Sequence, residues 1–103
     1  MLAHCVFLDF AKEHDTEARM AVLRGLERLG DEVDGMLAFH YGPNRDFEHK
    51  TPAHTEGFIV MFRDRDAHLE YERHPKHVEL GGQLVAMCNG GADGILVYDI
   101  ACA

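Results

Sequence analysis

The chain has 103 residues, of which 47 % are hydrophobic and 27 % charged, and its ten basic and eighteen acidic residues give a formal net charge of −8. These values predict one folded domain over residues 1–103, and the acidic balance argues against nucleic acid and membrane surfaces as partners. The longest apolar runs, Phe58–Phe62 and Leu84–Cys88, are too short to cross a bilayer, and no secretory signal opens the chain, so we expect a cytoplasmic location.

The first half of the chain predicts a strand, a helix and a second strand. His4–Phe10 is rich in Val, Phe and Leu, which is typical of a strand. Asp15 or Thr16 can cap a helix that runs to about Leu29, and the strand Met36–Tyr41 follows a turn. Apolar side chains recur in this helical region at spacings of four, three and four, which places them on one face: Val22, Leu26, Leu29 and Val33.

The second half predicts two more strands with a helical region between them. Arg45–Ala53 is polar and contains a proline, which is typical of an exposed loop, and the strand Thr55–Phe62 follows it. The last strand is Gly94–Ile100, which follows the Asn-Gly-Gly sequence that ends the preceding helix.

The helical region is interrupted by a proline. Asp64 or Asp66 can cap a short helix that runs through Glu72. Pro75 disfavours helix in the residue before it and suits a first turn, so a second helical segment starts at this proline or the next residue. That segment continues to about Cys88.

The order β-α-β-β-α-β predicts an α+β, ferredoxin-like fold with a four-stranded antiparallel sheet. Three of the strands are apolar on both faces, in the stretches Cys5–Leu8, Phe58–Phe62 and Ile95–Tyr98. Two helices can cover only one face of such a sheet, and a bare apolar face is not tolerated in water. We therefore expect a homodimer with its sheets face to face, a dimeric α/β barrel whose interior can hold a cavity.

Among eight histidines, those of the segment Tyr71–His77 are the strongest candidates for chemistry. Tyr71, His74 and His77 are spaced three residues apart, so they lie close to one helical face although Pro75 bends the path. His4 opens the first strand, and we expect it on the outer face of the sheet, lining the dimer interior.

These residues resemble the stress-responsive A/B barrel (Dabb) domain family over nearly the whole chain. The resemblance rests on the histidine in the apolar first strand, the turn Tyr41–Asn44, the strand Thr55–Phe62 with Arg-Asp-Arg after it, and Leu96–Asp99. Its most specific element is the YxxHPxH string that ends at His77. The family implies a ferredoxin-like monomer and a symmetric dimer whose sheets form an α/β barrel.

One plant member of this family is a polyketide cyclase that closes a ring by intramolecular aldol condensation. The resemblance places His77 on its general-base histidine, Tyr71 on the tyrosine beside that base, and His4 on a histidine lining the cavity. Glu56 stands where the cyclase has another cavity histidine, and the tyrosine on the first helix of the cyclase has no counterpart in the stretch Leu26–Arg28.

The generic chemistry of these side chains is coherent. A neutral imidazole, with an ordinary pKa of about 6.5, can take a carbon-bound proton next to a carbonyl group. A tyrosine hydroxyl can donate a hydrogen bond to the enolate oxygen that forms. Glu56, if it faces the same cavity, can fix the histidine tautomer or raise the pKa of the histidine. The predicted catalytic set is therefore His77, Tyr71, His4 and Glu56.

No metal or cofactor is predicted. No carboxylate completes a ligand triad with His74 and His77, and no context for a haem ligand is present. Three cysteines without a C-x-x-C pair favour buried apolar side chains over a disulfide framework or a zinc site. The remaining histidines assigned to the surface or to loops are His14, His49, His54 and His68.

Two functions stay open at this level. The first is a cofactor-independent lyase, cyclase or isomerase that acts on a small, partly apolar, carbonyl-bearing ligand with His77 as general base. The alternative is a non-catalytic, stress-associated binding or structural dimer. In that case His77 only bonds a backbone carbonyl, Tyr71 is a core aromatic and His4 lies at the dimer seam.

Overall fold

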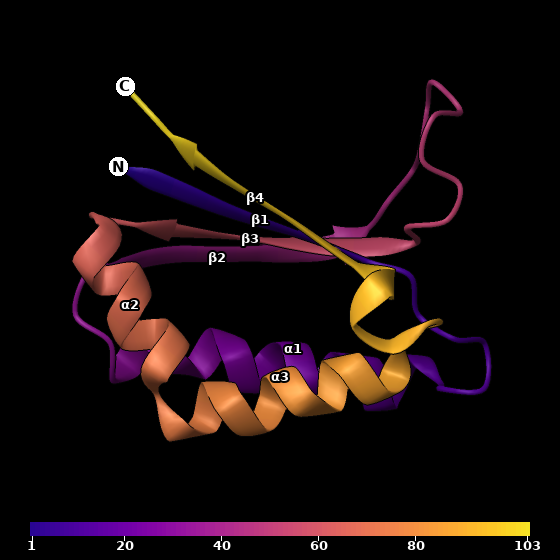
Figure 1. Cartoon of the computed structure of the whole chain (residues 1–103), viewed down its shortest axis with the longest axis horizontal. Coiled ribbons are helices and arrows are strands. Elements are labelled where there is room, and N and C mark those ends of the chain that lie inside the picture. Colours follow the sequence, from indigo (N-terminus) through magenta and orange to yellow (C-terminus); the bar gives the residue numbers. More distant parts are fainter.

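The computed structural model describes residues 1–103 as a four-stranded antiparallel sheet with three α-helices packed on one face (Figure 1). The strands are β1 (Leu2–Leu8), β2 (Met36–Pro43), β3 (Glu56–Phe62) and β4 (Ile95–Ala101), and the helices are α1 (Thr16–Arg28), α2 (Arg65–Arg73) and α3 (Pro75–Met87). The strand order β2-β3-β1-β4 is the predicted ferredoxin-like topology. None of the three helices is long and apolar enough to cross a membrane.

The helix starts follow the caps that the sequence offers. Asp15 caps α1 and Asp64, not Asp66, caps α2, since each carboxylate accepts a hydrogen bond from the backbone amide three residues on. His74 ends α2 in an extended conformation, and its Nδ1 accepts a hydrogen bond from the Lys76 amide at the start of α3. Pro75 occupies the first position of α3. The helical region therefore consists of two separate helices. His74 is both the C-cap of α2 and the N-cap of α3.

The first strand lies two residues earlier than predicted. β1 begins at Leu2 and ends at Leu8, and Phe10 makes only an isolated bridge with Cys88. Asp9 explains the early end, because its backbone N–H donates to Gly94 and its carbonyl accepts from Asn89, which turns the chain away from β3. The other strand ends agree with the prediction to within two residues.

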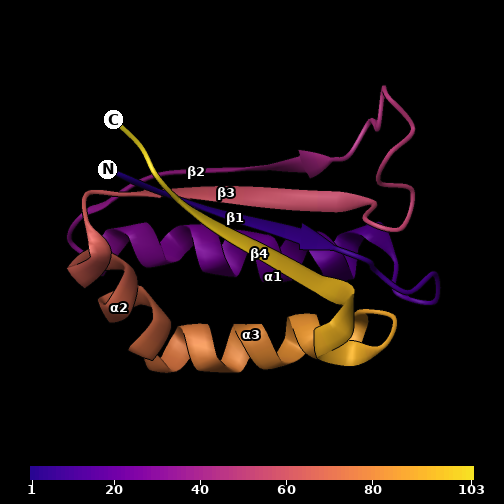
Figure 2. The ribbon, with the colours of Figure 1, turned by 45° about the horizontal axis from the view of Figure 1, so that its top comes forward.

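The sheet has one covered and one uncovered face, as predicted. Alternate strand residues pack against the helices and form the core with side chains of α1. The largest of these fully buried side chains are Leu8, Val60, Phe62, Leu23 and Leu26. The opposite face, here called the free face, carries Ile59, Leu96, Tyr98 and Ile100, which are between 38 and 54 % exposed. Figure 2 shows all three helices on the other side.

Candidate functional site

A cavity of about 320 Å³ lies between the sheet and the helices, and we call it the helix–sheet cavity. Its polar lining residues are His4 from β1, His68, Tyr71 and Glu72 from α2, and His77 from α3. The rest of the wall is apolar apart from one glycine. Three of the four predicted site residues therefore meet in one cavity, while their catalytic roles stay predictions.

The cavity lies within one chain, so the prediction that His4 lines the space between two sheets is wrong. His4 pairs in register with Val60, a core residue, and antiparallel partners point to the same face of a sheet. His4 also shares its face with Val6 and Leu8, two and four residues on. Because β1 is apolar on both faces, the pattern of the strand could not say which side the histidine takes.

Glu56 lies outside this cavity, so the expectation that it fixes a cavity histidine is wrong. It pairs with Leu8, four residues along β1 from His4. Its carboxylate lies 3.3 Å from Arg19 Nη1, and both side chains are largely buried. The Arg19 guanidinium in turn lies over the ring of Phe10, 5.1 Å from its centre. Glu56 therefore joins α1 to the start of β3.

His77 lines the cavity and keeps one ring nitrogen unprotonated. Its Nδ1 lies 3.1 Å from the carbonyl oxygen of Glu72, one of the last carbonyls of α2, which no longer has a helical partner. A carbonyl only accepts, so Nδ1 carries the hydrogen and Nε2 keeps its lone pair. Burial lowers the pKa of His77 below its ordinary value of 6.5, although the Glu72 hydrogen bond acts in the opposite direction. The ring is therefore neutral at pH 7.

Tyr71 lines the same cavity and has a buried hydroxyl without a partner. The side chain is 1 % exposed, and its buried hydroxyl makes no hydrogen bond within the chain. Its ring lies 4.5 Å from that of His77, centre to centre. Burial raises the pKa of Tyr71, so the group stays protonated at neutral pH. Leaving such a hydroxyl unpaired costs about 1–3 kcal/mol of folding free energy. A ligand oxygen that accepted a hydrogen bond from it would recover this cost.

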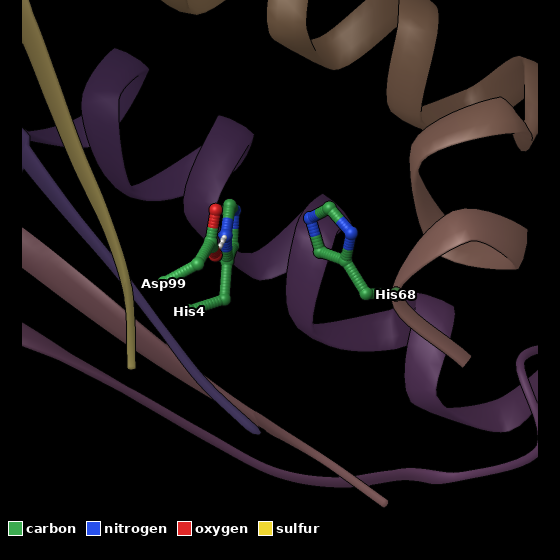
Figure 3. Close-up of side chains that lie close together, drawn as sticks. All are labelled: His4, His68 and Asp99. Atoms are coloured by element: carbon green, nitrogen blue, oxygen red, sulfur yellow. Dashed lines mark hydrogen bonds and ion pairs between the residues drawn. The ribbon is translucent and has the colours of Figure 1, made fainter. Parts of the chain in front are cut away.

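Two further residues of the site were not predicted. Asp99 accepts a hydrogen bond from His4 Nδ1 at 2.6 Å, and His68 projects from α2 toward both of them (Figure 3). The surface assignment of His68 is wrong, because this side chain is only 6 % exposed. Its spacing of three from Tyr71 puts both on the inner face of α2, and Asp99 is the register partner of His4 on β4. The spacing of His68 from Tyr71 is a signal within the sequence, whereas the pairing of His4 with Asp99 is seen only in the folded sheet.

His4, His68 and Asp99 have the residue types of a metal site, with ligand atoms within 4.8 Å of one another. Their contacts favour a hydrogen-bond network instead. The His4–Asp99 distance of 2.6 Å is that of a shared hydrogen, and Arg65 Nη1 lies 2.7 Å from His68 Nδ1. A guanidinium at that position adds a positive charge beside the group that would bind a cation.

We expect the free energy of unfolding to fall as the pH is lowered from about 7 to about 5.5. Burial lowers the pKa of both His68 and His77 in the folded chain. In the unfolded chain they titrate near 6.5, so below that pH the unfolded state binds more protons and becomes favoured. Urea titrations at a fixed protein concentration would measure this. A double variant, His68→Gln with His77→Gln, should show a smaller decrease, and an equal decrease would contradict the assignment.

The family model and a curated relative both match the stress-responsive A/B barrel domain. The sequence matches the Stress responsive A/B Barrel Domain family over residues 2–102. The stress-response A/B barrel domain-containing protein HS1 of Arabidopsis thaliana is 28 % identical over 96 residues, which span 93 % of this chain and 84 % of that protein.

Solved structures agree with this match. A dimeric ferredoxin-like protein of unknown function from Jannaschia sp. CCS1 has 42 % identity and a TM-score of 0.93, with 98 % of both chains covered. A hydroxynitrile lyase from Passiflora edulis has a TM-score of 0.82 over 99 % of this chain and 93 % of its own. At 13 % identity, the lyase is similar in fold alone.

Proposed function

The chain belongs to the stress-responsive A/B barrel (Dabb) domain family, and we propose that it is a cofactor-independent enzyme that moves a proton on a small, partly apolar, carbonyl-bearing compound. The compound occupies the helix–sheet cavity, with His77 as general base and Tyr71 as hydrogen-bond donor. Lyases, cyclases and isomerases that act through an enolate share this first step. The hydroxynitrile lyase of similar fold is an example of an enzyme with this architecture.

One observation carries the proposal, namely the buried Tyr71 hydroxyl without a partner beside a neutral His77 whose Nε2 is free. A ketone satisfies both groups at once, because its oxygen accepts from the hydroxyl and its α carbon carries a hydrogen for the imidazole. The apolar wall supports binding of the remaining hydrocarbon part.

The proposed step is a balanced proton transfer. The α carbon–hydrogen bond breaks, the hydrogen moves to His77 Nε2, and the bonding electrons move onto the carbonyl oxygen, giving an enolate. Tyr71 donates to that oxygen, whose charge grows in the transition state. The protonated imidazole then returns the hydrogen to carbon. A base of this kind typically contributes about 10²- to 10⁴-fold to the rate.

We also propose that two chains associate through their free faces. Leu96, Tyr98 and Ile100 of β4 are exposed there, beside a hollow of about 460 Å³ that reaches the loop between β2 and β3. An apolar patch of this kind marks an interaction surface, and a dimeric neighbour with 42 % identity supports a second copy as the partner. The helix–sheet cavity needs no residue from that copy. A cytoplasmic location remains a prediction.

The proposal is tested by hydrogen exchange from 1-phenylpropan-2-one in D₂O, followed by proton NMR. We expect the wild-type protein to exchange the benzylic hydrogens faster than buffer does. A His14→Gln variant, changed outside the cavity, should keep the wild-type rate. If the ketone binds in the cavity and exchanges no faster than in buffer, the non-catalytic binding alternative is correct.

A further inference from the structure

His68 is held in one tautomer by its neighbour on α2. Arg65 lies three residues earlier, on the same side of the helix, and its Nη1 is 2.7 Å from His68 Nδ1. A guanidinium has only donors, so Nδ1 accepts and the hydrogen of the neutral ring must sit on Nε2. Burial, the nearby His4 and the Arg65 charge all lower the pKa of His68, while Asp99 and Glu72 act against them. The ring is therefore a neutral donor at pH 7.

This donor is available to a ligand. His68 lines the helix–sheet cavity, and its Nε2 makes no hydrogen bond within the chain. Its ring lies 4.8 Å from that of His4, which lies 6.0 Å from that of Tyr71, centre to centre. Two unpartnered donors, the Tyr71 hydroxyl and His68 Nε2, therefore belong to rings that both lie near His4 in the cavity lining (Figure 3 shows His68 and His4).

The charges around the cavity disfavour an anion. No lysine or arginine lines it, whereas Glu72 does, and Asp99 lies directly behind His4. Arg65, which is adjacent to His68, has its Nη1 engaged by that ring. A carboxylate in this cavity would meet two acidic side chains and only neutral donors, so it would lose its hydration without a compensating charge.

We propose that the substrate is a neutral compound with two hydrogen-bond-accepting oxygens, one bound by Tyr71 and the second by His68 Nε2, which makes His68 a specificity-determining residue. The identification of the first oxygen with the reacting carbonyl rests on the proposed function. The second oxygen and the exclusion of anions rest on Arg65, His68 and the charges of the cavity wall.

Binding of three matched ketones to the full chain, measured by NMR titration, tests the role of His68. 1-Methoxy-3-phenylpropan-2-one has the second oxygen, 1-phenylpentan-2-one replaces that oxygen by a methylene, and 4-oxo-5-phenylpentanoate carries a carboxylate. In His68→Phe, the affinity ratio of the methoxy ketone to the methylene ketone should fall by about 3- to 10-fold, the value of one neutral hydrogen bond. His68→Gln keeps an N–H donor and should retain part of the ratio. The carboxylate should bind about tenfold more weakly than the methoxy ketone.

An unchanged ratio in His68→Phe, or a carboxylate that binds as tightly as the methoxy ketone, would overturn the proposal. Long-range ¹H–¹⁵N spectra give a readout that needs no ligand, since the His68 ring should show a protonated Nε2 and an unprotonated Nδ1. The opposite tautomer, or a doubly protonated ring at pH 7, would also overturn it. None of these measurements depends on proton exchange, so a protein with this selectivity and no exchange activity contradicts only the proposed function.

Discussion

Replacing His77 by glutamine is expected to slow hydrogen exchange from 1-phenylpropan-2-one by about 100- to 10,000-fold, the contribution of a positioned general base. Glutamine retains a polar side chain of similar length but cannot take a proton from carbon at neutral pH. The Glu72 carbonyl that orients the His77 ring belongs to the backbone and is unchanged by the substitution. The loss should therefore appear in the rate constant for exchange rather than in the affinity for the ketone.

The measurement is the exchange rate at saturating ketone, with the dissociation constant measured separately by NMR titration. His14→Gln serves as the matched control, because it makes the same change at a histidine outside the cavity. A His77→Gln protein that binds the ketone and exchanges at the wild-type rate would show that another group removes the hydrogen.

Two glutamates on the free face should separate the dimer. In a variant with Tyr98→Glu and Ile100→Glu, the association that we propose would bury four carboxylates between two largely apolar sheet faces. Each unpaired buried charge costs several kcal/mol, so the chain should be a monomer at micromolar concentration. Sedimentation equilibrium measures the mass directly.

A glutamate at an exposed apolar side chain away from the free face serves as the control for the loss of the dimer. Val78→Glu lies on α3, on the helical side of the molecule, and should leave the dimer intact. The monomeric double variant should still bind 1-phenylpropan-2-one, because every lining residue of the helix–sheet cavity comes from one chain. A double variant that remains dimeric would place the interface elsewhere.

The sequence predicted the order of the elements because the signals for them are local. The cap at Asp15, the spacing of Val22, Leu26 and Leu29, and the proline at the start of α3 each act within a few residues. The apolar character of both sheet faces followed from strand composition alone. Those features were sufficient for the fold and for the expectation that helices cover one face.

The arrangement of the site could not be predicted in the same way. His4 and Asp99 are 95 residues apart in sequence and meet only through the register of β1 with β4. His68 lies in a short helix full of charged residues, and only the packing of Tyr71 against Phe62 shows which face turns inward. Glu56 was placed by resemblance, while its actual partner, Arg19, is 37 residues away. Each of these relations is set by tertiary contacts.

The Tyr71 hydroxyl gives the most direct test of the account. Removing it in Tyr71→Phe eliminates a buried polar group that has no partner in the chain, so the free energy of unfolding should rise by about 1 kcal/mol. The same change removes the donor to the enolate oxygen and should slow hydrogen exchange by about 100-fold or more. The deciding measurement is the exchange rate of this variant. A large decrease in a folded, ketone-binding protein is the predicted result, and exchange at the wild-type rate would contradict the role of the cavity as a reaction site.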